Sequence, residues 1–182
     1  MKSLLSLIFV VICGGSIHAQ MFQVGQITAA GAGCVGGNID LSVDDNGLVL
    51  SYPQMKISPN SQKTIDRVSC NIAIPFSLPP GFQLVATAVT NGAAALEKSD
   101  RGNVSQELFF AGSTSVVKKA VLKAGSRSFQ LASGLAPFRS ACGQSLILRN
   151  NLNATLIKAN SASRAVVSVA TTKLAIQVVP CQ

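Results

Sequence analysis

The sequence predicts an all-β protein folded as an antiparallel β-sandwich, immunoglobulin-like or jelly-roll-like, with two disulfides. Apolar side chains alternate with polar or small ones from Ile72 to Leu78, which is the period of a strand with one buried face. Glycine, proline and asparagine recur between such segments as turn signals. No long segment has the apolar period of a helix, so about ten short strands are expected.

Residues 1–19 are predicted to be a signal peptide that is removed from the mature protein. Lys2 supplies a positive charge, and Leu4–Cys13 is an apolar segment of the length found in signal peptides. Ala19 is a small residue of the kind expected before a cleavage point, so cleavage is expected before Gln20. Without Lys2, the net charge falls from +8 to +7.

The remaining residues, 20–182, are expected to form one domain that is secreted or periplasmic. No apolar run within them reaches the roughly 18 residues of a membrane helix. A lipid anchor on Cys13 is an alternative, but Ile12 stands before it, where a lipoprotein signal requires a small residue. The sequence therefore predicts an exported chain without a transmembrane segment.

Four cysteines remain after removal of the leader: Cys34, Cys70, Cys142 and Cys181. An even number of cysteines in an exported chain indicates two disulfides. Three pairings are possible, and the spacing does not choose between them. We expect Cys34–Cys70 and Cys142–Cys181, which would staple the first and last parts of the domain separately.

The first part of the domain is predicted to contain a strand, a tight loop and a hairpin. A strand is expected over 21–27, and four glycines around Cys34 indicate an irregular loop. Residues 39–43 and 48–52 alternate as two strands, and the Asn-Gly pair within Asp44–Gly47 is typical of a hairpin turn. The oxygen-rich turn can also suit Ca²⁺, but no further acids follow at ligand spacing.

The central part is predicted to be a second hairpin. Pro79–Gly81 ends the strand at Leu78 and turns the chain toward a strand that begins at Phe82. A polar loop that ends in a short strand into Cys70 is expected before it over 53–67, and Ala93–Lys98 is a candidate for one helical turn. Further strands are expected over residues 104–110, 116–122, 129–131, 146–148, 154–157, 164–172 and 174–179.

Six short motifs are similar to those of a known family. They are G-A-G-C at Gly31–Cys34, C-N-I-A-I-P at Cys70–Pro75, P-P-G-F at Pro79–Phe82, E-L-F-F-A-G at Glu107–Gly112, C-G at Cys142–Gly143 and the terminal Pro180–Cys181. Together they resemble DUF4360, a domain-of-unknown-function family of small secreted proteins from fungi and bacteria. The resemblance implies secretion, two disulfides and a β-rich domain. It implies no assigned activity, and it supplies no catalytic residue.

Catalytic chemistry is limited by the residues available. The only histidine, His18, lies in the leader, which excludes nucleophilic systems that depend on histidine and disfavours zinc. Glu107 lies within a predicted strand, where it is expected to pair with a neighbouring Lys or Arg; a hydrolase using carboxylates is the enzymatic alternative. Ser115 and Lys118 match a Ser-x-x-Lys motif, but the required helix and companion motifs are missing. A non-enzymatic protein without cofactor or metal is therefore predicted.

Positive charge is the one collective feature of the surface. Residues 108–182 contain nine Lys and Arg and no Asp or Glu, and this asymmetry favours anionic partners. The cluster predicted to bind the anion is Lys118, Lys119, Lys123 and Arg127.

The predicted function is binding of an extracellular or envelope partner through this basic half. An anionic envelope polysaccharide or another protein fits that surface. Specific recognition of nucleic acid is not expected, because no motif is present and aromatic residues are few. The alternative is a structural or matrix component whose basic surface serves solubility and has no specific ligand.

Overall fold

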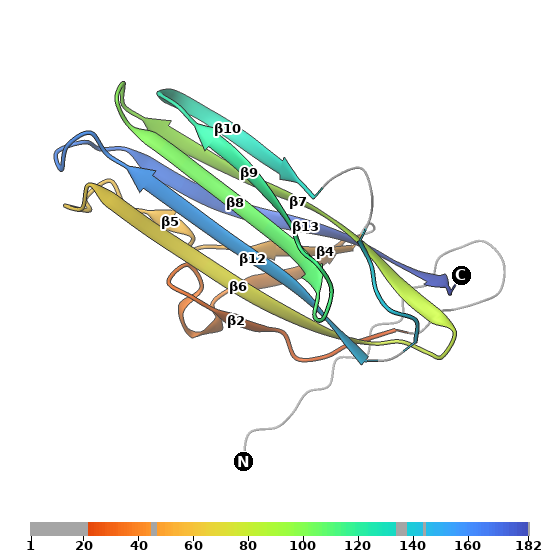
Figure 1. Cartoon of the computed structure of the whole chain (residues 1–182). Coiled ribbons are helices and arrows are strands. Elements are labelled where there is room, and N and C mark those ends of the chain that lie inside the picture. Colours follow the sequence, from red (N-terminus) through yellow and green to blue (C-terminus); the bar gives the residue numbers. More distant parts are fainter. Residues whose placement is uncertain (1–21, 45–46, 134–137, 144, 182) are drawn as a thin grey trace, which may run out of the picture.

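The computed structural model describes residues 22–44, 47–133, 138–143 and 145–181, and these form two antiparallel sheets packed face to face (Figure 1). The predicted signal peptide lies outside the described residues. Within them, the chain forms thirteen strands and one short 3-10 helix, η1 (Val35–Gly37). The predicted antiparallel β-sandwich is confirmed.

Sheet A is built around a long strand near its centre. Its strands are β1 (Gln23–Val24), β2 (Thr28–Ala30), β6 (Ile65–Ser77), β8 (Arg101–Phe110), β9 (Val116–Leu122) and β12 (Ser145–Ile157). Strand β12 pairs with β6 on one side and with β8 on the other. The short strands β1 and β2 both pair with β6 at one edge, and β9 forms the opposite edge.

Sheet B lies against sheet A and has a similar plan. Its strands are β3 (Asp40–Asp44), β4 (Gly47–Ser51), β5 (Lys56–Ile57), β7 (Phe82–Leu96), β10 (Gly125–Ala132), β11 (Phe138–Arg139) and β13 (Val166–Pro180). The order along the sheet is β10, β7, β13, β4 and β3. Strands β3 and β10 are therefore the two edges of sheet B.

Strand β7 runs through the segment for which the sequence predicts a helical turn. Its alanines pair with β10 on one side and with β13 on the other, so both neighbours satisfy the backbone. A Cβ on Gly92 would lie 2.2 Å from Cζ of Phe129 and 2.4 Å from the carbonyl oxygen of Ser168. Small residues allow this close packing, and sheet pairing outweighs helix propensity. The predicted helical turn at Ala93–Lys98 is wrong.

Strands β12 and β13 are each continuous where the sequence predicts two shorter strands. Polar residues in the middle of β12 do not interrupt it, because Asn150 is buried and hydrogen-bonded while its neighbours face outward. In β13 the register shifts between Val169 and Thr171, and after this irregularity Thr172 and Leu174 point into the core.

The Pro79–Gly81 connection crosses from one sheet to the other. Gly81 has a φ of +81°, as a sharp turn requires. However, β6 belongs to sheet A and β7 to sheet B, so the predicted central hairpin is wrong. Each strand instead pairs over most of its length with a distant segment, β6 with β12 and β7 with β13.

The first predicted hairpin is confirmed in its strands. Strands β3 and β4 pair antiparallel, with Val43 opposite Leu48, and Gly47 has a φ of +139°. Residues 45–46 at the tip, and with them the Ca²⁺ interpretation of this turn, lie outside the described residues. The polar loop expected over 53–67 contains β5 and the start of β6.

The core lies between the sheets and includes one of the two disulfides, Cys34–Cys70. The largest fully buried apolar side chains come from both sheets and include Phe76, Leu50, Met55, Leu84, Leu148, Leu152 and Leu174. Cys34–Cys70 joins the glycine-rich loop to β6, and Cys142–Cys181 joins the segment before β12 to the end of β13. Their Cα atoms are 5.4 and 5.7 Å apart, respectively, and the predicted pairing is confirmed.

Candidate binding surface

The outward side of sheet A carries a polar surface on its long strands. Successive side chains of a strand alternate between the core and solvent, and the register aligns the outward ones in rows. We call part of this surface the cationic face, and it consists of Arg67, Ser69, Arg101, Asn103, Ser105, Lys119, Asn153 and Thr155. All eight side chains are exposed or half-buried.

Neighbouring rows of the cationic face place cations beside amides and hydroxyls. Arg67 and Asn103 flank Thr155 in one row, and Lys119 stands opposite Ser105 in the next. Strands are about 4.8 Å apart, and successive outward residues of one strand are about 6.7 Å apart. The face therefore offers charges and hydrogen-bonding groups at spacings that suit a repeating polar ligand.

The cationic face is not neutralised by acidic side chains. None of Arg67, Arg101 and Lys119 forms an ion pair within the part of the chain that the structure describes. Aliphatic side chains lie between them: Ile157, opposite Arg101, is 47% exposed, and Val121, opposite Asn103, is 68% exposed. The surface thus combines free positive charge with exposed apolar patches.

Glu107 lies in the row that follows the cationic face. Its carboxylate accepts a short hydrogen bond from Oγ of Ser115 and one of 3.0 Å from Nδ2 of Asn151. These hydrogen bonds hold the pKa of Glu107 below its usual value. Glu107 is therefore an ionised, fixed acceptor, and its partners are Ser115 and Asn151 instead of the expected Lys or Arg.

The Ser-x-x-Lys match and a metal site find no support in the described residues. Ser115 precedes β9 and donates to Glu107, while Lys118 lies within that strand and not on the helix that the motif requires. Glu107 is also the only carboxylate on the outward side of sheet A in the described chain. No three His, Cys, Asp or Glu of the described residues group together as metal ligands.

The structure separates the four predicted anion-binding residues. Lys119 points outward opposite Ser105, whereas Lys118 points inward opposite the buried Gln106. Lys123 follows β9 in the turn to β10, and Arg127 lies on β10 in sheet B.

Arg127 also has a local role, because its Nη2 donates to the carbonyl oxygen of Ala124 at 3.2 Å. Adjacent charged residues of a strand necessarily face opposite sides. The strand predicted over 116–122 was the sequence signal that could have separated Lys118 from Lys119. Arg67 and Arg101 are members of the cationic face that the sequence reasoning missed, because they lie before residue 108.

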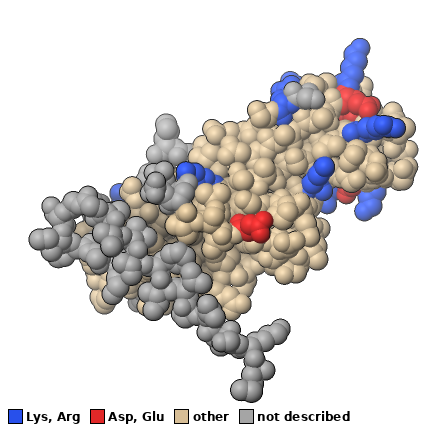
Figure 2. Space-filling model, turned by 180° about the vertical axis from the view of Figure 1, so that it is seen from behind, with Lys and Arg blue, Asp and Glu red and all other residues tan. Residues whose placement is uncertain are grey.

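Positive charge is also concentrated at one end of the molecule. This distal end holds the β7–β8 turn, the β9–β10 turn and the β12–β13 loop. Figure 2 shows Lys and Arg gathered toward this end on the side seen there, with a few acidic side chains among them. Lys98, Lys123 and Arg164 in the three connections are exposed. The cationic face thus adjoins further positive charge.

Two charged residues at the distal end have a structural role. The Asp100 carboxylate accepts hydrogen bonds from Oγ of Ser163 and from the backbone N–H groups of Ala159 and Glu97. Burial alone would raise the pKa of Asp100, but these bonds and the nearby Lys158 outweigh it and hold the pKa below its usual value. Lys158 is buried and donates to the carbonyl oxygens of Pro59 and Ser61 at 3.3 and 2.8 Å. Asp100 and Lys158 thus connect the β7–β8 turn, the β12–β13 loop and the segment between β5 and β6.

A chain of polar side chains crosses the core between the sheets. Nε2 of Gln106 donates to Oδ1 of Asn150 at 2.9 Å, and Nδ2 of Asn150 donates to the Tyr52 hydroxyl at 3.1 Å. The hydroxyls of Thr90 and Thr172 are 2.6 Å apart. Burial raises the pKa of Tyr52, so this phenol stays neutral. All five side chains are buried in the core.

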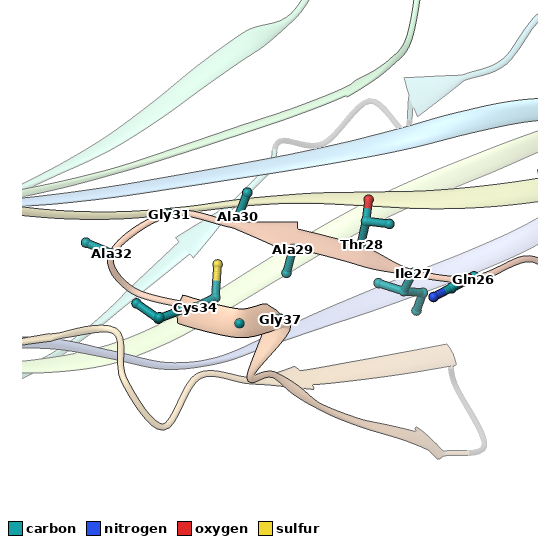
Figure 3. Close-up of a pocket in the computed structure, with 11 residues that line it drawn as sticks. Gln26, Ile27, Thr28, Ala29, Ala30, Gly31, Ala32, Cys34 and Gly37 are labelled. Carbon is teal, nitrogen blue, oxygen red and sulfur yellow. The ribbon is translucent and has the colours of Figure 1, made fainter. Parts of the chain in front are cut away.

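Two hollows lie beside the glycine-rich loop, and Gly37 lines both. The first is a polar hollow of about 700 Å³ formed by β2 and the glycine-rich loop that folds back along it (Figure 3). The second is an apolar groove of about 640 Å³ between β1–β2 of sheet A and β3–β4 of sheet B.

No helix within the described residues is long and apolar enough to cross a membrane.

Weak structural likenesses connect the chain with carbohydrate-binding modules. TmCBM61 in complex with β-1,4-galactotriose has a TM-score of 0.33 at 8% identity, over 85% of this chain and 88% of that chain. The xylan-binding module CBM15 has a TM-score of 0.32 at 8% identity, over 86% and 96%. A family 11 module from Clostridium thermocellum has a TM-score of 0.23 at 9% identity, over 90% and 92%. These values carry no argument about function.

Comparison of sequences identifies the family. No curated protein matches the chain. A family model described as a domain of unknown function, DUF4360, matches residues 20–180, which is nearly the whole predicted mature chain. The resemblance carried by the cysteine, C-N-I-A-I-P and E-L-F-F-A-G motifs is thereby confirmed. The chain belongs to the DUF4360 family.

Proposed function

We propose that this protein is an exported, non-catalytic binding protein that holds an acidic polysaccharide on the cationic face. The observation that carries the proposal is the set of three cations, Arg67, Arg101 and Lys119, on a face without a carboxylate. Two disulfides and the predicted leader support export.

The chemistry of the face favours carboxylates or sulfates that are carried on sugars. Arginine presents a planar fork that matches such groups, and two of the three cations are arginines. Asn103, Asn153 and the neighbouring hydroxyls can donate to and accept from sugar hydroxyls. Exposed aliphatic groups such as Val121 can contact the apolar sides of sugar rings. Electrostatic attraction of this kind weakens with salt.

The test is binding of the oxidised mature protein to polygalacturonate, with neutral dextran as the control polymer. We expect the protein to bind polygalacturonate at 20 mM salt, with an affinity that falls at least about tenfold at 300 mM salt. We expect no binding to dextran. Arg101→Glu should lower the affinity at low salt about tenfold or more, because it removes one attraction and adds one repulsion.

A matched control is available on the opposite sheet. Arg139→Glu changes charge by the same amount on β11, at an exposed position on the outward side of sheet B. It should leave binding within about twofold of the wild type if the cationic face is the site. Equal losses in both variants would show that only net charge matters. Salt-insensitive self-association without polymer binding would instead support a structural or matrix component.

A further inference from the structure

The apolar groove is an unsealed part of the hydrophobic core. It lies between the short edge strands of sheet A and the β3–β4 hairpin of sheet B. Figure 3 shows Ala29 on β2, and Ile27 just before β2, pointing to the side on which that hairpin lies. Leu41 and Val43 face it from β3. Among the described residues, the lining consists only of aliphatic side chains, one phenylalanine and glycines.

The inward residues of β3 are unusually exposed. Leu41 pairs with the fully buried Leu50, and Val43 pairs with the buried Leu48, so both point toward the space between the sheets. Nevertheless Leu41 is 43% exposed and Val43 is 44% exposed. Inward apolar residues normally lose nearly all contact with water. The two sheets therefore leave apolar surface uncovered along this edge.

The opposite edge of the sandwich is built differently. There two inward edge positions carry charges, Lys118 on β9 and Arg127 on β10, although Val116, also inward on β9, is 46% exposed. Inward-pointing charges on edge strands discourage further apolar association. The described lining of the groove has no charged or polar side chain, so the groove edge lacks this protection.

The polar hollow adjoins the groove and shares a wall with it. Ile27, Ala29 and Gly37 line both spaces. Beyond this wall the lining changes to Gln26, Thr28 and the backbone of the glycine-rich loop (Figure 3). A ligand lying across the wall would have an apolar part in one space and a polar part in the other. This division matches an amphiphile with one hydrocarbon tail.

We propose that the groove binds the hydrocarbon tail of a single-chain amphiphile, with its polar head over the glycine-rich loop. Apart from backbone groups, the described lining of the groove has no donors or acceptors, so it can replace little of the hydration of a polar ligand, and polar ligands are disfavoured. A volume of about 640 Å³ falls within the range of small-ligand sites. Burial of each additional methylene should tighten binding up to about fourfold until the groove is filled.

The experiment measures fluorescence of the uncharged probe N-phenyl-1-naphthylamine with the oxidised mature protein. We expect saturable binding that 1-octanol, 1-decanol and 1-dodecanol displace with increasing strength. Val43→Lys should weaken probe binding at least about tenfold, because it places a charge at the apolar wall. Ser42→Lys is the matched control, since Ser42 is exposed on the other side of β3, and it should change binding less than twofold.

A second variant protects the test against loss of folding. Ala29→Phe fills the groove without a charge and should also weaken the probe at least about fivefold. Circular dichroism checks that each variant keeps its strands. Absence of probe binding, or equal effects of Val43→Lys and Ser42→Lys, would overturn the proposal. So would a dimer of the wild type that Val43→Lys dissociates, because a second copy would then cover the groove.

Discussion

The two lateral edges of the sandwich differ in the side chains that point inward between the sheets. At the closed edge, β9 and β10 belong to different sheets but are joined by Lys123 and Ala124, and their inward positions include Lys118 and Arg127. At the groove edge, β1–β2 and β3 face each other across an apolar space. A charged residue on an edge strand can therefore protect the fold, whereas an uncharged edge leaves apolar surface for a ligand.

The charges at the closed edge include two residues of the predicted basic cluster. Lys118 and Arg127 occupy inward edge positions, where edge protection is a sufficient role, and Lys119 is the member of the cluster that lies on the cationic face. Binding of an anion by any of the four remains a prediction. The variants described above, together with those below, separate protection of an edge from binding by a face.

The largest loss of stability is expected when a glycine beside the groove is replaced. At Gly47, in the β3–β4 hairpin, φ is +139° and an added Cβ would lie 2.0 Å from the carbonyl oxygen of Leu174. Gly47→Ala should lower the free energy of unfolding by about 2–4 kcal/mol, because backbone must move in addition to the strain at φ. Urea denaturation measures the loss.

A matched glycine lies beside the closed edge. Gly112, in the β8–β9 connection, has a φ of +89°, but an added Cβ would meet nothing within 4 Å. Gly112→Ala should therefore destabilise by only about 1 kcal/mol, from backbone strain alone. If both variants lose the same stability, the close approach of the hairpin at Gly47 to β13 is unimportant.

An intermediate effect on the free energy of unfolding is expected from Asp100 at the distal end, and this effect depends on pH. The depressed pKa of Asp100 means that its contribution to stability is fully present above the unfolded pKa of about 4 and is lost as pH falls through the lower, folded value. Asp100→Asn should lower stability at pH 7 by about 1–3 kcal/mol, since it weakens the bonds to Ser163 and Ala159.

The pH dependence supplies the check on this prediction. The stability difference between the wild type and Asp100→Asn, measured by urea denaturation from pH 7 to pH 2, should shrink as the pH falls below about 4. The groove has no carboxylate in its described lining, so probe binding should persist in this range while the protein is folded. A difference independent of pH would show that Asp100 acts through packing alone.

The smallest effect on stability is expected at the closed edge. Lys118→Val replaces a half-buried inward charge and should change the free energy of unfolding by less than about 1 kcal/mol. It should, however, increase self-association at high protein concentration, because it removes the inward charge from β9. Lys119→Val, one residue further and outward, is the control. Equal self-association of the two variants by light scattering would contradict protection by Lys118.

Several features of the protein followed from local sequence alone. Alternation from Ile72 to Leu78 predicted a strand, the Asn-Gly pair before Leu48 predicted a hairpin whose strands pair as expected, and the cysteines predicted the disulfides. The predicted loss of His18 with the leader disfavours catalysis that depends on histidine, and this stays a prediction. These properties depend on side-chain period, turn chemistry or composition, which are present in the chain before it folds.

The tertiary structure decided how strands combine and which residues share a face. The sequence of Ala93–Lys98 indicates a helical turn, but pairing with β10 and β13 makes most of this segment a strand. The sequence of Pro79–Gly81 indicates a hairpin turn, but the chain crosses there from β6 of sheet A to β7 of sheet B. Arg67 and Lys119 come together on one face although they are far apart in sequence. Sheet pairing is non-local, so a residue's neighbours are determined only when distant strands meet in register.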